Sequence, residues 1–143
     1  MKRSTLISGI IGGVALWIFG FIFYGIANAT EPFQTEEGMA VMKGEDEMSM
    51  LWLFIGHLIV GIFSALIYDR WAQGRHNFKN GLVFGTVLGL VIGVGLNVIW
   101  YSVNKSMLAG GYVADAVFNV VAYGLMGAVI AFIYSKMEKE LSD

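Results

Sequence analysis

Four long apolar stretches divide the chain, and they constrain its fold more than any other feature. They cover residues 6–27, 50–68, 81–103 and 112–134, and among them only Asp115 carries a full charge at neutral pH. Each has 19 to 23 residues, and a helix needs about 20 apolar residues to cross a bilayer. The pattern predicts an all-α transmembrane four-helix bundle that forms one domain over residues 1–143, with consecutive helices antiparallel.

The composition excludes most other classes of protein. Of the 143 residues, 57% are hydrophobic and only 14% are charged, whereas soluble domains average about 25% charged residues. A chain of this size has too little interior to bury so much apolar surface in water. The 9 basic and 11 acidic residues argue against a nucleic-acid partner. The absence of cysteine excludes disulfides and thiolate chemistry.

The basic residues predict the orientation, because cytoplasmic loops carry an excess of Lys and Arg. Only Lys43 and Lys105 flank the apolar stretches on one side. Those on the other side are Lys2, Arg3, Arg70, Arg75, Lys79, Lys136 and Lys139. We therefore expect a protein of the cytoplasmic membrane with both termini in the cytoplasm. The loop over residues 28–49 would then lie outside.

Two parts of the chain resemble each other. Residues 60–70 (VGIFSALIYDR) align with residues 126–136 (MGAVIAFIYSK) at an offset of 66, and residues 12–25 align more loosely with residues 89–102. The first and third helices would run outward and the second and fourth inward, so the match predicts two tandem hairpins in the same orientation. Chance similarity between apolar helices explains the match equally well.

Glycines recur at every fourth position of the third stretch, at Gly81, Gly85, Gly89 and Gly93, and Gly61 is followed by Ala65 at the same spacing. Residues four apart share one face of a helix. Small residues on such a face let two helices approach closely in lipid. These glycines are therefore predicted to pack helices together, either within one chain or between copies of it.

Each apolar stretch places a polar side chain in its predicted outer half, whereas the inner half holds few beyond Ser8, Ser64 and Thr86. Tyr123 continues the row of Asp115 and Asn119. The candidate residues are Tyr24, His57, Asn97, Asp115, Asn119 and Tyr123. Polar groups are costly in hydrocarbon and normally face the bundle interior or a cavity. They predict a polar pocket that opens outward and binds a small molecule or ion, with His57, Asn97, Asp115 and Asn119 as its lining. The alternative is that they bond only to one another and hold the helices together.

The predicted outer loop combines acidic residues with methionine. It carries six acids against one lysine. Its methionines, with the first residue of the next stretch, form two close pairs, Met39 with Met42 and Met48 with Met50. Thioethers suit Cu(I), so the loop is a candidate copper site. The alternative is an amphipathic segment at the membrane surface, with its apolar side chains against lipid.

Aromatic residues gather near the ends of the stretches. They are Trp52, Trp71, Trp100, Tyr68, Tyr101, Tyr112 and Tyr134. Trp and Tyr are enriched at both membrane–water interfaces. We therefore expect these side chains to anchor the helices at the membrane surface.

The overall layout resembles that of small bacterial four-span integral membrane proteins of unknown function. The resemblance comprises the basic N-terminus, a glycine-rich first stretch with Trp17 and Tyr24, the acidic loop and the repeated Ile-Tyr-Asp-Arg and Ile-Tyr-Ser-Lys ends. It implies a membrane protein and no particular activity.

The sequence contains no hydrolase, metalloprotease or nucleotide-binding signature. We expect a non-enzymatic scaffold or accessory subunit without a cofactor, which associates with itself or with a larger membrane complex. Binding or transport of a small molecule or ion through the polar pocket is the second hypothesis. Copper handling by the loop is the third.

Overall fold

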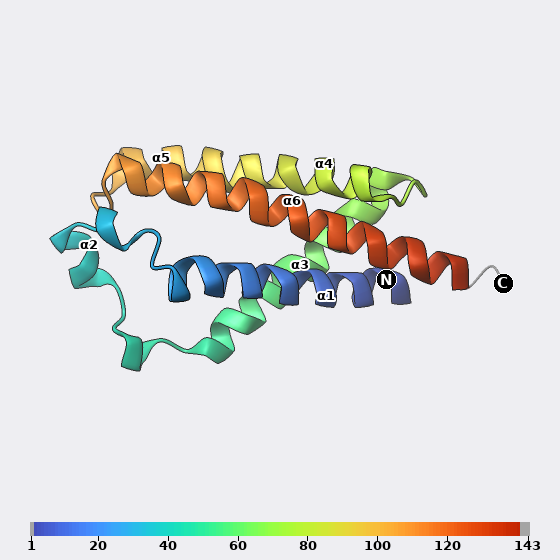
Figure 1. Ribbon diagram of the computed structural model, residues 1–143, viewed down its shortest axis with the longest axis horizontal. Coiled ribbons are helices and arrows are strands. Elements are labelled where there is room, and N and C mark those ends of the chain that lie inside the picture. The colour runs from blue at the N-terminus through green and yellow to red at the C-terminus, as the bar shows by residue number, and fades with distance from the viewer. Residues whose placement is uncertain (1, 141–143) are drawn as a thin grey trace.

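Figure 1 shows a computed structural model of the chain, in which residues 2–140 are described. The described residues form helices and contain no β-strand beyond a single bridge between Gln34 and Met107. In chain order the elements are α1 (Arg3–Gly20), η1 (Phe21–Ile26), η2 (Glu31–Phe33), α2 (Glu36–Val41), η3 (Glu45–Glu47), α3 (Met50–Ala72), α4 (Phe78–Gly89), η4 (Leu90–Leu96), α5 (Asn97–Val103) and α6 (Ala109–Glu140).

Four helical runs are long and apolar enough to cross a membrane, as the sequence predicts. They are Arg3–Ile26, Met50–Ala72, Phe78–Val103 and Ala109–Glu138. The helices extend past five of the eight ends of the predicted stretches, by up to six residues at the end of α6, because backbone hydrogen bonding continues into the flanking residues. The beginning of α1 and the end of α6 lie at the same end of the molecule (Figure 1). We call it the terminal end, and the opposite end, formed by residues 28–49 and 104–111, the long-loop end.

The helices do not close into a compact bundle. α1 packs along α3 and α6, and α6 packs along α4 and η4. α3 makes few contacts with α4 or α6, and Figure 1 shows it diverging from the other helices towards the long-loop end. The expected bundle is therefore open along one side at that end.

Glycine makes the closest contact between α1 and α3. A Cβ atom added to Gly61 would lie 2.6 Å from the Cα of Gly13 and closer still to the carbonyl oxygen of Gly9. A Cβ on Gly9 would in turn lie 2.6 Å from the Cα of Ile62. Only glycine permits this approach of the two backbones.

The glycine row of the third helical run forms a similar contact with α6. Gly127 faces Gly81 and Gly85, and its added Cβ would lie 2.8 Å from the amide nitrogen of Gly85. Further along, Cβ atoms on Gly89 and Gly93 would lie 2.6 Å from Val120 Cα and Asn119 Cβ, respectively. All four glycines of the row thus face α6 of the same chain.

Three tyrosines of α3 and α6, predicted to anchor these helices at the membrane surface, are instead buried. Tyr68 and Tyr134 have no exposed surface, and Tyr112 is only 6% exposed. Tyr112 donates a hydrogen bond to the Asn104 side chain, with 2.5 Å between the oxygens. The interfacial prediction is wrong for these residues, because tertiary contacts cover the ends of the helices that carry them. By contrast, Trp52 is 71% exposed.

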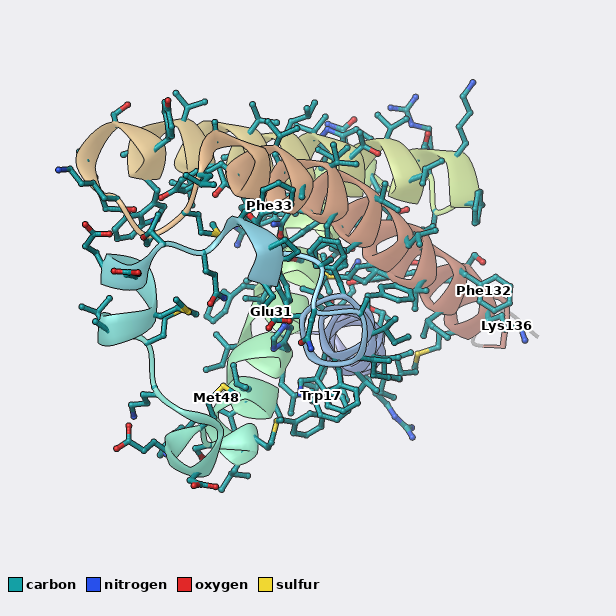
Figure 2. The ribbon with its side chains drawn as sticks, turned by 60° about the vertical axis from the view of Figure 1, so that its left-hand side comes forward. Trp17, Glu31, Phe33, Met48, Phe132 and Lys136 are labelled. Carbon is teal, nitrogen blue, oxygen red and sulfur yellow. The ribbon has the colours of Figure 1, made fainter. Side chains whose placement is uncertain are left out.

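The loop after η1 packs against the loop before α6. The Leu108 amide donates to the Phe33 carbonyl at 2.8 Å, the Phe33 ring covers Gly110, and the Phe33 Cβ lies beside Gly111. Figure 2 shows Phe33 beside the beginning of α6. The Thr35 amide donates to the Ser106 carbonyl at 3.2 Å. These hydrogen bonds fix the first half of the long loop against the segment that leads into α6. The second half of the loop leads away from it to α3.

Candidate functional site

The Asp115 carboxylate joins three segments at the long-loop end. Tyr24 of η1 donates its hydroxyl proton to Asp115 Oδ1. Asn97, the first residue of α5, donates its Nδ2 to Asp115 Oδ2 at 2.5 Å, and Asn119 donates its Nδ2 to the same oxygen at 2.9 Å. Three donors from three segments thus converge on one carboxyl group, whose oxygens accept hydrogen bonds.

Two π-helical segments position the donors that come from outside α6, Tyr24 and Asn97. Tyr24 lies within η1, and Asn97 directly follows η4. A π-helical turn widens the backbone and shifts the side chains that follow it, and such turns occur often at functional sites. Asn97 Nδ2 also donates to the Gly93 carbonyl at 2.6 Å, inside the widened segment. Tyr24, Asn97 and Asn119, from the first, third and fourth predicted stretches, therefore meet around the Asp115 carboxylate.

His57 lies outside this cluster. Its Nδ1 is 2.7 Å from the Leu53 carbonyl oxygen of its own helix. Its other nitrogen faces α1, where a Cβ added to Gly20 would lie 3.5 Å from Nε2. The predicted pocket is thus divided, with Asp115 and its donors on one side and His57 on the other, because α3 diverges from α4 and α5.

His57 and Tyr123 instead line a cleft between α1, α3 and α6 with a volume of about 570 Å³. The lining residues are Leu16, Lys43, Ser49, Trp52, Leu53, Gly56, His57, Val60 and Tyr123. Most of the lining is apolar, and among the lining residues that the structure describes Lys43 alone carries a full charge. The divergence of α3 creates this space.

The four loop methionines are all exposed. Met39 belongs to α2 and Met42 directly follows it, whereas Met48 follows η3 and Met50 begins α3. Figure 2 shows Met48 beside the beginning of α3, away from the docked half of the loop. The two methionine pairs therefore lie on different parts of the loop. Nothing in this arrangement favours copper binding over exposure of the loop at the membrane surface.

A second polar cluster, which the sequence analysis did not predict, lies at the terminal end. The hydroxyl groups of Thr5 and Tyr134 share a hydrogen bond, and both residues are buried. The His76 ring stacks on Tyr134 with centroids 4.5 Å apart, and its Nε2 lies 3.4 Å from a carboxylate oxygen of Glu138. The Tyr68 hydroxyl has no hydrogen-bond partner among the described residues.

One signal in the sequence could have indicated this cluster. Tyr68 and Tyr134 occupy the same position in the two aligned segments, directly after an isoleucine. A repeated tyrosine suggests a repeated environment rather than two independent surface anchors. His76 gave no comparable signal, because it stands in a polar turn.

Residues 2–140 contain no cluster of three His, Asp or Glu side chains able to hold a metal ion, as far as their side chains are described. The chain matches no protein-family model, no curated protein and no solved structure.

Proposed function

We propose that this chain is a non-enzymatic integral protein of the cytoplasmic membrane that binds a small amphiphilic molecule in the cleft between α1, α3 and α6. The cleft carries the proposal. Its volume of about 570 Å³ lies within the range of about 300–1,000 Å³ that is usual for small-molecule sites. Apolar walls with a few polar groups are the typical lining of such sites.

The proposed orientation puts both termini in the cytoplasm and the long-loop end outside. It is supported by seven basic residues on the terminal side of the spans against two on the other, as cytoplasmic loops favour Lys and Arg. The cleft would then open into the outer half of the bilayer. Because the chain has no cysteine, single-cysteine variants test this directly. A membrane-impermeant maleimide should label Lys43→Cys on intact cells, and Arg75→Cys only after permeabilisation. The reverse pattern would contradict the orientation.

We further propose that the fold is a tandem pair of hairpins. The contacts at Gly61 and Gly127 support this, since each residue faces two glycines spaced four apart on the preceding long helix. Gly61 and Gly127 are also aligned in the 66-residue repeat. On this view, the first hairpin is α1 with α3 and the second is the third helical run with α6, and α3 makes few contacts with α4 of the second hairpin.

The cleft is tested by blocking it without disturbing the helix contacts. A Cβ on Gly56, which lines the cleft, would meet nothing within 4 Å. Gly56→Leu should therefore fill the cleft. Gly95→Leu is the matched control, because its Cβ would meet only one atom, at 3.9 Å, and Gly95 does not line the cleft.

Native mass spectrometry would measure binding after incubation of the purified chain with oleic acid, oleyl alcohol and oleylamine. We expect one-to-one retention of at least one of these probes by the wild type and by Gly95→Leu. Gly56→Leu should lose it. Retention that Gly56→Leu does not change, or no retention by any variant, would overturn the proposal.

A scaffold or accessory subunit is the second candidate. It is favoured by the outward face of α3, which α4 leaves uncovered and where Phe63 and Ile67 are 59% and 51% exposed. The glycine rows do not support it, since they are used within the chain. Cross-linking through single cysteines at Phe63 and, as the control, at Val121 of α6 would distinguish an α3 interface from random collision.

A further inference from the structure

The cleft presents two free hydrogen-bonding groups of opposite kind. A carbonyl oxygen only accepts, so the 2.7 Å contact with Leu53 places the proton of neutral His57 on Nδ1. Its Nε2 therefore offers a lone pair. No hydrogen bond among the described residues uses the Tyr123 hydroxyl, although that residue is only 8% exposed, so the hydroxyl can act as a donor.

A carboxyl group matches this pair. Its O–H donates to His57 Nε2, and its carbonyl oxygen accepts from Tyr123. If the proton passes to Nε2, an imidazolium–carboxylate pair forms, and charge-assisted hydrogen bonds of this kind are stronger than neutral ones. The pair has no net charge in either form. Binding therefore adds no net charge to the cleft.

The charge of the cleft favours the same ligand. Lys43 is the only fully charged side chain among the lining residues. Its ammonium group would attract an anionic head group as it arrives. A protonated amine would be repelled by Lys43 and could not accept a hydrogen bond from Tyr123.

We propose that the cleft binds a long-chain carboxylic acid, with its carboxyl group between His57 and Tyr123 and its alkyl chain along Leu16, Leu53 and Val60. This inference rests on the proposed function. The ligand would enter sideways from the lipid, through the side on which α3 and α4 make few contacts. That route keeps the alkyl chain in an apolar environment throughout.

Competition among oleic acid, oleyl alcohol and oleylamine on the wild-type chain tests the head group. We expect oleic acid to be retained about tenfold more strongly than the other two, which corresponds to one charge-assisted hydrogen bond. His57→Phe, which keeps an aromatic ring, should lower oleic acid retention about tenfold or more. Tyr123→Phe should lower it about fivefold. Neither variant should change the weak retention of oleyl alcohol by as much.

The outcomes separate this inference from the proposed function. Preferred retention of oleyl alcohol or oleylamine, lost in Gly56→Leu, would overturn the carboxylic acid and leave the cleft as the binding site. Oleic acid retention unchanged by both His57→Phe and Tyr123→Phe would also overturn it. If His57→Phe does not fold, as judged by its unfolding midpoint in detergent, Tyr123→Phe and His57→Gln still decide.

Discussion

Tyr68 and Tyr134 meet at the terminal end with ring centroids 5.9 Å apart, and neither side chain is exposed. They occupy equivalent positions in the two aligned segments, but their hydroxyl groups differ. The Tyr134 hydroxyl shares a hydrogen bond with Thr5, whereas the Tyr68 hydroxyl has no partner among the described residues.

This difference predicts unequal effects of the same substitution. Tyr134→Phe should lower the free energy of unfolding by about 1–2 kcal/mol, because it leaves the buried Thr5 hydroxyl unpaired. Tyr68→Phe should be neutral or slightly stabilising, because it removes an unsatisfied buried hydroxyl. Denaturant titration of both variants in detergent micelles would measure the difference. A larger loss for Tyr68→Phe would mean that its hydroxyl has a partner, such as a buried water.

The glycine contacts predict a second contrast. Gly61→Ala should destabilise the chain by about 1–3 kcal/mol, the usual range for overpacking, because the new methyl group would collide with the backbone of Gly9 and Gly13. Gly56→Ala, on the same helix, should stabilise it by up to about 1 kcal/mol, because alanine favours helix more than glycine. Unfolding midpoints in one detergent would compare them. Equal effects would contradict the close contact between α1 and α3.

Around Asp115, replacing an acceptor by a donor should disrupt the cluster. Asp115→Asn exchanges one carboxylate oxygen for an amide NH₂ that faces groups which also donate, and we expect a loss of about 1–3 kcal/mol. Ser102→Ala is a suitable control, since this exposed hydroxyl bonds only to its own helix at Val98. Unfolding titrations of both variants test this. If Asp115→Asn were as mild as the control, the cluster would contribute little to stability.

Lys2, which directly precedes α1, forms an ion pair with Asp69 of α3, and this pair depends on pH. Lys2 Nζ lies 3.1 Å from Asp69, and the hydrogen bond and opposite charge of Asp69 raise the pKa of Lys2 above its usual 10.5. The folded state therefore holds this proton more tightly than the unfolded state does. The stabilisation is complete below the unfolded pKa and is lost as the pH rises through the folded one.

Lys2→Met tests this pair. The effect should be small, because Lys2 is exposed and solvent screens the pair. At about pH 9 the unfolding midpoint of the variant should lie below that of the wild type, and the two midpoints should converge towards about pH 12. A gap that stays constant over this range would show that Lys2 acts through packing rather than charge.

The four long helices could be predicted from hydrophobicity alone, because a helix long enough to cross lipid needs about 20 apolar residues in a row, and such stretches are visible in the sequence. The glycine rows likewise indicated close packing. Their partner was not predictable, since a row of small residues fits a helix of the same chain or of another copy equally well. The structure places Gly81 and Gly85 against Gly127, and this contact is visible only once α4 and α6 are side by side.

The candidate site was predicted in part for a similar reason. Depth along the helices correctly grouped Tyr24, Asn97 and Asn119 with Asp115. It could not separate His57 from them, because the position of α3 depends on how the long loop packs. That packing comes from backbone hydrogen bonds such as Leu108 to Phe33, which leave no periodic pattern in the sequence.

The placement of the glycine contacts also bears on how the chain is made. Each contact joins two long helices that are consecutive in the chain, α1 with α3 and α4 with α6. The first pair can therefore assemble while the second is still on the ribosome, from parts already synthesised. The contacts of α6 with α4 and with α1 must both wait for the last helix. The long-loop end of α3 is never enclosed by that final step, so the space beside it persists in the finished protein.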